Sequence, residues 1–386
     1  MLHLLASLMV ASTMLAMAST ATADSVDLLV GTYTQGKSQG IYRYRFDSNR
    51  GEISAQPEQL VLTSNPSWLT LSPDQRRLYV VNENGPGQAD SVGKVSSFSI
   101  AAKTHVIEPI NVVESHGDEP THASLSKDGR LLFVANYAVH PEPGGSAVVL
   151  GVADDGSLLP MVQQERHSPS RVDPERQAGS HVHSAVAAPN GRYVYVSDLG
   201  ADKVFVYRLD GANAQWPLGP ATPGAISLPP GSGPRHLLFD AKNKYAYLTL
   251  EMSAQVVKFD YRSGGLDREG IFDLDQKGGP KGAGGALHLS ADGRFLYVSN
   301  RGAANQLLVF AVDADTGDLR EVQRRSVDGD HPREFAIDPS GRFVLIANQK
   351  SNAIVVMERD AKTGLLGKTV QKFGIDSPAD LKFLAP

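Results

Sequence analysis

The sequence predicts an all-β protein: a seven-bladed β-propeller with four antiparallel strands per blade. Three observations predict this fold, namely a repeat of about fifty residues, short strands separated by turns rich in Gly, Pro, Asp and Asn, and two chain ends that each resemble part of one blade. A helical solenoid would need a 3.6-residue apolar period, which the repeats lack. We therefore expect a single propeller domain over residues 24–386.

The repeat is most regular in a hairpin that recurs six times. Its second strand ends at Asn82, Asn136, Asp198, Leu250, Asn300 and Asn348. The steps between these positions are 54, 62, 52, 50 and 48 residues. Each hairpin consists of an apolar strand, a turn such as APNG or SADG, and a second strand whose β-branched and aromatic content favours a sheet.

A third and a fourth strand complete each unit. The third strand is clearest at Val204–Tyr207, Leu307–Phe310 and Ala353–Met357. Polar turns follow the last two of these, DADTGDL at 313–319 and DAKTGLL at 360–366, and each leads into a weaker strand. Four antiparallel strands in about fifty residues are typical of one propeller blade.

The seventh blade is expected to combine the two ends of the chain. Leu28–Tyr33 resembles the second strand of a blade, but no first strand precedes it in the mature chain. Pro378–Leu384 resembles that missing first strand, and nothing follows it. Pairing the C-terminal strand with the N-terminal blade closes the ring and removes two exposed sheet edges, which would otherwise promote aggregation.

The first 23 residues predict export. They contain no Asp, Glu, Lys or Arg, and an apolar stretch runs from Leu4 to Met17 before Ala21-Thr22-Ala23. This pattern is typical of a secretory signal peptide cleaved after Ala23, and the stretch is too short to span a bilayer. A mis-assigned start codon or a buried N-terminal helix is the alternative. We expect a periplasmic or secreted protein with no membrane insertion after cleavage.

Composition excludes several classes of function. The chain has 37 Lys and Arg against 42 Asp and Glu, a net charge of -5, and so lacks the basic excess that phosphate neutralisation in nucleic-acid binding requires. It contains no cysteine, which removes disulfides, thiolate zinc sites and cysteine nucleophiles. A small-molecule ligand is therefore a better expectation than a nucleic-acid partner.

The chemistry of a propeller is expected in its central funnel. Innermost strands begin, and second strands end, on the same face of the ring, so residues at both places converge there. The candidates at these positions are His122, His183, Arg235, His236, Glu251, His288, Arg301, Arg333 and Gln349. Asn136, Asn300 and Asn348 recur at one register, which favours a role in the scaffold.

Four of these candidates depart from the repeat. His183, Arg235, Glu251 and Arg301 stand where sister blades carry other residue types, which indicates function, because charges in a cleft persist mainly when they are paired or used. We predict these four as the catalytic set. We predict His122, His236, His288, Arg333 and Gln349 as the substrate-binding set.

The same segments carry a family resemblance. The strings HVHSAVAAPNGRYVYVSDLGADKV, GPRHLLFD, LTLE, HLSADGRFLYVSNRG and HPREFAIDPSG resemble the seven-bladed lactonase family that includes bacterial 6-phosphogluconolactonase and the fungal carboxymuconate lactonizing enzyme. The resemblance covers nearly all of the chain after Asp24. It implies a cleft that binds a sugar lactone or a related carboxylate without an obligatory metal. It also implies that His183, Arg235, Glu251 and Arg301 are similar to the active-site residues proposed for that family.

The residue types agree with lactone hydrolysis. The reaction creates a tetrahedral oxyanion, which Arg235 could stabilise while Arg301 or Arg333 holds a carboxylate, phosphate or hydroxyl of the substrate. Either His183 or Glu251 could be the general base that activates water. A serine nucleophile is disfavoured, because no G-x-S-x-G elbow occurs in a strand-to-helix context.

A metal site is the main mechanistic alternative. His181-x-His183 and nearby Asn and Glu residues could collect an ion, but the arginines at the same positions would repel a cation, so we expect neither metal nor cofactor. Export favours an unphosphorylated aldonolactone over 6-phosphogluconolactone, which is made in the cytoplasm. Two other functions stay open: a non-catalytic platform that binds a sugar acid, glycan or protein, and a lactonizing cycloisomerase acting on a muconate-like substrate.

Overall fold

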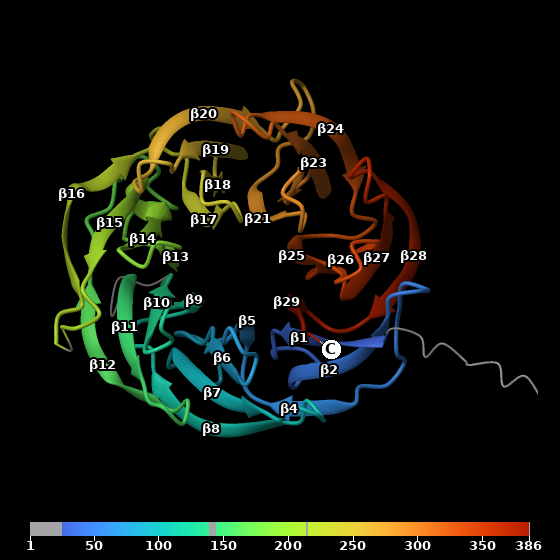
Figure 1. Cartoon of the computed structure of the whole chain (residues 1–386), viewed down its shortest axis with the longest axis horizontal. Helices are drawn as coiled ribbons and strands as arrows, with labels where there is room; N and C mark the ends of the chain where they lie inside the picture. Colours follow the sequence, from blue (N-terminus) through green and yellow to red (C-terminus); the bar gives the residue numbers. More distant parts are fainter. Residues whose placement is uncertain (1–24, 139–143, 214, 386) are drawn as a thin grey trace, which may run out of the picture.

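The computed structural model describes residues 25–138, 144–213 and 215–385, which form a ring of seven antiparallel sheets around a central axis (Figure 1). The seven-bladed propeller predicted from the repeat is confirmed. Within the described ranges, no helix is long and apolar enough to cross a membrane. The predicted signal peptide and its cleavage position at Ala23 lie outside the described residues.

Six blades are each built from four consecutive strands. The second blade contains β5 (Pro66–Leu71), β6 (Arg77–Asn82), β7 (Lys94–Ile100) and β8 (Ile107–Glu114). The third contains β9 (Pro120–Leu125), β10 (Leu131–Asn136), β11 (Ser146–Val152) and β12 (Leu158–Glu165). The fourth contains β13 (Val182–Ala187), β14 (Tyr193–Asp198), β15 (Lys203–Leu209) and β16 (Leu218–Ser227). The fifth blade contains β17 (Pro234–Phe239), β18 (Tyr245–Leu250), β19 (Gln255–Asp260) and β20 (Asp267–Asp273). The sixth contains β21 (Gly284–Leu289), β22 (Phe295–Asn300), β23 (Gln306–Val312) and β24 (Leu319–Ser326). The seventh contains β25 (Pro332–Ile337), β26 (Phe343–Asn348), β27 (Ala353–Arg359) and β28 (Leu366–Gly374).

The first blade joins the two ends of the chain, as predicted. Its strands are β29 (Pro378–Phe383), β1 (Ser25–Thr32), β2 (Gly40–Asp47), β3 (Glu52–Ile53) and β4 (Gln59–Leu62). The order is β29-β1-β2, and β3 and β4 both pair with β2 at the outer position. The C-terminal strand therefore supplies the innermost strand of the blade that begins the chain.

Burial explains which sequence suits each strand of a blade. The second strands β18, β22 and β26 are buried along their whole length, because the neighbouring blades cover both faces of each sheet. Their continuous apolar content follows from this position. The outer strand β8 instead mixes buried and exposed residues. The innermost strands β5, β9, β13, β17, β21, β25 and β29 surround the central opening (Figure 1).

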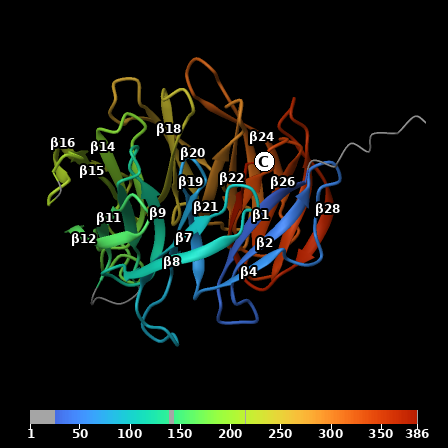
Figure 2. The ribbon, with the colours of Figure 1, turned by 60° about the horizontal axis from the view of Figure 1, so that its bottom comes forward.

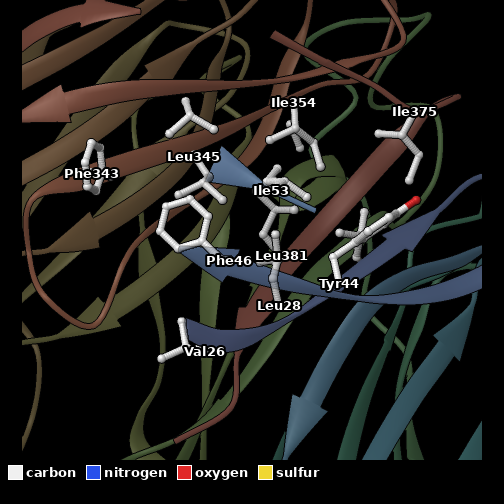
Figure 3. Close-up of a cluster of buried hydrophobic side chains, with 13 residues drawn as sticks. Val26, Leu28, Tyr44, Phe46, Ile53, Phe343, Leu345, Ile354, Ile375 and Leu381 are labelled. Carbon is white, nitrogen blue, oxygen red and sulfur yellow. The ribbon is translucent and has the colours of Figure 1, made fainter. Parts of the chain in front are cut away.

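A core cluster seals the joint between the last blade and the first. Phe46 and Leu381 of the first blade meet Phe343 and Leu345 of the seventh in this cluster (Figure 3). Strands β1 and β2 lie beside β26 and β28 in the oblique view as well (Figure 2). The Gln371 side chain binds the backbone of Ile53 twice, accepting from its N–H at 2.8 Å and donating to its carbonyl at 3.1 Å. The ring is thus closed by both packing and hydrogen bonds.

The asparagines that end four of the second strands tie their blades to the segment that enters each of them. The Asn136 amide donates to the Ser115 carbonyl at 2.9 Å and to the Ser146 hydroxyl at 3.1 Å. Asn348 donates in the same way to the Val327 carbonyl at 3.0 Å. Both side chains are fully buried. These contacts support the scaffold role predicted for this register.

We expect Asn136→Ala to lower the free energy of unfolding by about 1–3 kcal/mol, because it leaves the buried Ser115 carbonyl without a donor. Urea unfolding measures this change, and the exposed Asn190→Ala is a matched control that should stay within about 0.5 kcal/mol of the unchanged protein. Folded Asn136→Ala should keep its turnover. A variant that is fully stable but inactive would contradict the scaffold assignment.

Candidate active site

The candidate site lies where two sets of equivalent strand positions meet around the axis of the ring. The first set, the residue after each second strand, is Tyr33, Glu83, Tyr137, Leu199, Glu251, Arg301 and Gln349. The second set, the second residue of each innermost strand, is Ala379, Ser67, Thr121, His183, Arg235, Gly285 and Arg333. The strand register brings the sets together, since Pro234 pairs with Leu250 and Pro332 with Asn348.

The structure brings the four residues of the predicted catalytic set together. Glu251 Oε2 accepts from Arg301 Nη2 at 2.7 Å and from Arg235 Nε at 3.1 Å. His183 Nε2 lies 3.9 Å from the same oxygen. Glu251 Oε1 accepts from a further arginine, Arg176, at 2.8 Å. We call these five residues the Glu251 cluster.

The local sequence explains why Arg235 and Glu251 meet. Gly233 has a φ of +65°, which residues with a side chain rarely adopt, and a Cβ atom there would lie 2.8 Å from Met252 Cγ. Its N–H donates to the Asp202 carboxylate at 3.0 Å, and its carbonyl accepts from the Glu251 N–H at 2.7 Å. The glycine thus joins the start of β17 to the end of β18.

A second glycine lies beside the strand that leads to Arg301. A Cβ atom at Gly285 would lie 2.3 Å from the Ser299 hydroxyl, whereas Arg301 Cγ would be at an ordinary contact distance of 3.4 Å. Because this position carries no side chain, the Ser299 hydroxyl has room to accept from the Ala286 N–H at 2.9 Å. The backbone N–H of Arg301 donates to the Ala283 carbonyl at 2.9 Å, which holds the base of the side chain.

The charges of the cluster determine which groups are ionised. Burial alone would raise the pKa of Glu251, but the guanidinium groups of Arg301 and Arg235 outweigh it and hold the pKa far below its usual range. Burial and the charge of Arg301 lower the pKa of Arg235 to about 9, so Arg235 is still a cation at neutral pH. Glu251 is consequently a permanent anion and a weak proton acceptor.

His183 has the opposite character. Burial and the adjacent charge of Arg235 hold its pKa well below the usual 6.5, so the ring is neutral at physiological pH. Its Nδ1 atom is buried and has no hydrogen-bond partner among the described residues. The cluster therefore contains one neutral imidazole that can accept a proton, beside three guanidinium groups and one carboxylate.

Two members of the predicted substrate-binding set lie directly behind the cluster. His236 accepts a hydrogen bond at Nδ1 from Arg235 Nη1 at 3.1 Å, and its ring centroid lies 5.1 Å from that of His183. The His122 ring lies 5.8 Å from that of His236 and 4.5 Å from that of Trp68. Burial lowers the pKa of His122 to about 3. His236 thus contacts both Arg235 and His183, and His122 packs against His236 and Trp68.

The other three members stand at two different strand positions. His288 stands three residues further along its innermost strand than the cluster positions, and its Nε2 contacts Glu334 Oε1 at 2.6 Å. Gln349 follows β26, and its buried Oε1 has no partner among the described residues. Arg333 forms an ion pair with Glu83 at 2.8 Å. The structure thus places Arg333 and Gln349 at the level of the cluster and His288 further along its innermost strand.

Sequence reasoning missed Arg176. It lies in the segment between β12 and β13, where the Asp173 carboxylate accepts from the Arg176 N–H at 2.9 Å. The next residue, Gln177, is fully buried and donates to the Leu199 carbonyl at 2.9 Å and to Asp202 at 2.8 Å. This anchoring presents Arg176 to the funnel with 44% of its side chain exposed. The 62-residue step of the repeat was the one signal of this added segment.

The residues proposed for a metal alternative do not converge. His181 directs Nδ1 at the Tyr137 carbonyl at 3.0 Å, whereas His183 directs Nε2 at Glu251. Across the described part of the chain, no three His, Asp or Glu side chains gather as a metal ion would require.

Comparison with known proteins agrees with the fold and places it in a family. Residues 27–383 match the family model described as lactonase, 7-bladed beta-propeller. The chain is 33% identical over 359 residues to the 6-phosphogluconolactonase of Bacillus subtilis, covering 92% of this chain and 97% of that protein. It is 32% identical to the 6-phosphogluconolactonase of Formosa agariphila, covering 92% and 98%.

A solved structure is similar over nearly the whole length. The periplasmic gluconolactonase of Pseudomonas aeruginosa superposes with a TM-score of 0.91 at 52% identity, covering 94% of this chain and 99% of that one. The family model alone spans most of the chain, and the resemblance noted in the sequence is thereby confirmed. The chain belongs to the seven-bladed β-propeller lactonase family.

Proposed function

We propose that this protein hydrolyses an unphosphorylated aldonolactone to its sugar acid at the Glu251 cluster. The observation that carries the proposal is the neutral, buried His183 beside three guanidinium groups that share one carboxylate. The similar structure from Pseudomonas aeruginosa is a periplasmic gluconolactonase, which supports this substrate class.

In the proposed reaction, His183 is the general base. It accepts a proton from a water molecule while the water oxygen attacks the lactone carbonyl carbon. The nearby Glu251 carboxylate stabilises the imidazolium that forms. When the carbonyl re-forms, the bond from the carbonyl carbon to the ring oxygen breaks, and the imidazolium returns its proton to that oxygen. One water is consumed and one hydroxy acid is released, so the protons balance.

The arginines stabilise the charge that develops on the carbonyl oxygen. Arg235 is the best placed to do so, because only 1% of it is exposed and the Glu251 and His236 contacts fix its guanidinium plane. A donor held in this way needs no reorganisation when the oxyanion forms. Glu251 acts as a positioning residue that orients the arginines and limits their mutual repulsion.

Export is part of the same proposal. Cleavage of the predicted signal peptide after Ala23 would bring the enzyme to a compartment where sugars are oxidised without prior phosphorylation. Intact-mass measurement of protein from a periplasmic fraction should give an N-terminus at or near Asp24. Protein that retains Met1 and stays in the cytoplasm would contradict both the export and this argument for the substrate.

A pH-stat assay tests the activity. Purified mature protein should acidify a weakly buffered solution of glucono-1,5-lactone faster than the spontaneous reaction, and a chelator should leave the rate unchanged. Binding of gluconate without acceleration of any lactone in a panel of five- and six-membered rings would instead identify a binding platform and refute the lactonase proposal.

A further inference from the structure

A second group of charged residues occupies the funnel at the level of the Glu251 cluster. Tyr33 Oη donates to Glu83 Oε2 at 2.7 Å, and Arg333 Nη2 donates to the same oxygen at 2.8 Å. The Arg333 guanidinium lies over the Tyr33 ring, 4.9 Å from its centroid. Tyr33 and Glu83 follow the second strands of the first and second blades, and Arg333 is the second residue of the innermost strand of the seventh.

This Tyr33–Glu83–Arg333 group has features of a ligand-binding surface. The side chains of Glu83 and Arg333 are 15% and 14% exposed, so both reach the funnel. Glu83 Oε1 accepts no hydrogen bond from any residue that the structure describes, whereas Oε2 accepts two. The stacked Tyr33 ring and the shared carboxylate fix the Arg333 guanidinium. Glu83 Oε1 can thus accept a hydrogen bond from a ligand, and the remaining N–H groups of the Arg333 guanidinium can donate to one.

The two groups differ in net charge. The Glu251 cluster sets three guanidinium groups against one carboxylate, which leaves two positive charges. The Tyr33–Glu83–Arg333 group sets one guanidinium against one carboxylate and is neutral. An anion is therefore stabilised on the Glu251 side of the funnel. On the other side, hydroxyl groups can both donate to Glu83 Oε1 and accept from Arg333, whereas a phosphate dianion would face a carboxylate.

We propose that Tyr33, Glu83 and Arg333 bind the hydroxyl-bearing end of the lactone that lies away from its carbonyl, and that Glu83 excludes lactones phosphorylated at that end. This inference rests on the proposed lactonase function and names the residue that sets its substrate class. Glu83 is a specificity residue in this account and takes no part in the proton transfers.

Glu83→Gln tests the inference on two substrates. The unchanged protein should have a higher kcat/KM for glucono-1,5-lactone than for its 6-phosphate. Glu83→Gln removes the carboxylate charge that repels a phosphate, and it leaves the Arg333 guanidinium without its counterion. Both effects favour the phosphorylated lactone, so the ratio of the two kcat/KM values should shift toward the 6-phosphate by about tenfold or more. Turnover of δ-valerolactone, which has no hydroxyl groups to contact Glu83, should change less than turnover of glucono-1,5-lactone.

Two further variants keep the test decisive. Glu108→Gln removes the same charge from an exposed position on the outer strand β8 and should leave the ratio unchanged. Glu83→Ala removes the charge together with the carboxamide, should shift the ratio in the same direction, and carries the test if Glu83→Gln does not fold. An unchanged ratio in folded, active Glu83→Gln and Glu83→Ala, or a preference of the unchanged protein for the 6-phosphate, would overturn the inference. Absence of hydrolysis of either lactone by the unchanged protein would refute the proposed function itself.

Discussion

Arg235→Ala is expected to lower kcat for glucono-1,5-lactone by about 10²-fold or more, the range for loss of one fixed oxyanion donor. Arg235 lies between Glu251 and His236 and is almost completely buried, so its guanidinium is held in one position by fixed partners. Steady-state kinetics on folded protein measures the loss. Arg192→Ala, at an exposed position, is the matched control and should keep its activity.

The pH profile separates this role from a merely structural one. The charge of Arg235 lowers the pKa of His183, so its removal should move the acid limb of kcat/KM to higher pH. Arg235→Lys keeps the charge but not the planar pair of donors, and should recover part of the rate. An Arg235→Ala variant that is folded and retains nearly full turnover would show that the oxyanion is stabilised elsewhere.

Glu251→Gln should also lower kcat by about 10²-fold or more. The amide can still accept hydrogen bonds, but Arg176, Arg235 and Arg301 then have no common counterion, and the imidazolium of His183 loses its stabilising charge. Buried guanidinium groups without a counterion also destabilise the fold, so Glu251→Gln should unfold at a lower temperature than the unchanged protein. Circular dichroism measures this difference beside the kinetics.

The two possible bases give opposite pH results in this variant. Glu251 raises the pKa of His183, so with His183 as the base the acid limb should persist in Glu251→Gln and move to lower pH. His183→Ala should then remove the limb and most of the activity. If Glu251 were the base, the limb would disappear in Glu251→Gln and remain in His183→Ala.

The fold could be predicted almost completely from the sequence because a repeat determines architecture. The second strands ending at Asn82 through Asn348 set the blade boundaries, and the unmatched ends of the chain predicted the pairing of β29 with β1. Glu251 and Arg301 could be found because they differ from the residues at the equivalent position of the other blades. The fold directs that position toward the axis of the ring.

Other parts of the site could not be predicted in this way. Arg176 lies in an inserted segment that has no counterpart in the other blades, so no register assigned it a place. His288 stands on an innermost strand like His183, yet three residues further along, which places it against Glu334. Glu83 and Arg333 are 250 positions apart and meet only because the ring closes, so a repeat alone did not indicate their ion pair.

The most direct test of the central claim, that a neutral His183 activates water in the Glu251 cluster, is the pH dependence of kcat/KM for glucono-1,5-lactone in the unchanged protein. The pKa of His183 is lowered, so the base form persists as the pH falls through 6.5. With His183 as the base, kcat/KM should be constant from about pH 7.5 down to 6.5, with the midpoint of the acid limb below 6.5. A midpoint at or above 6.5, after subtraction of the spontaneous reaction, would contradict it.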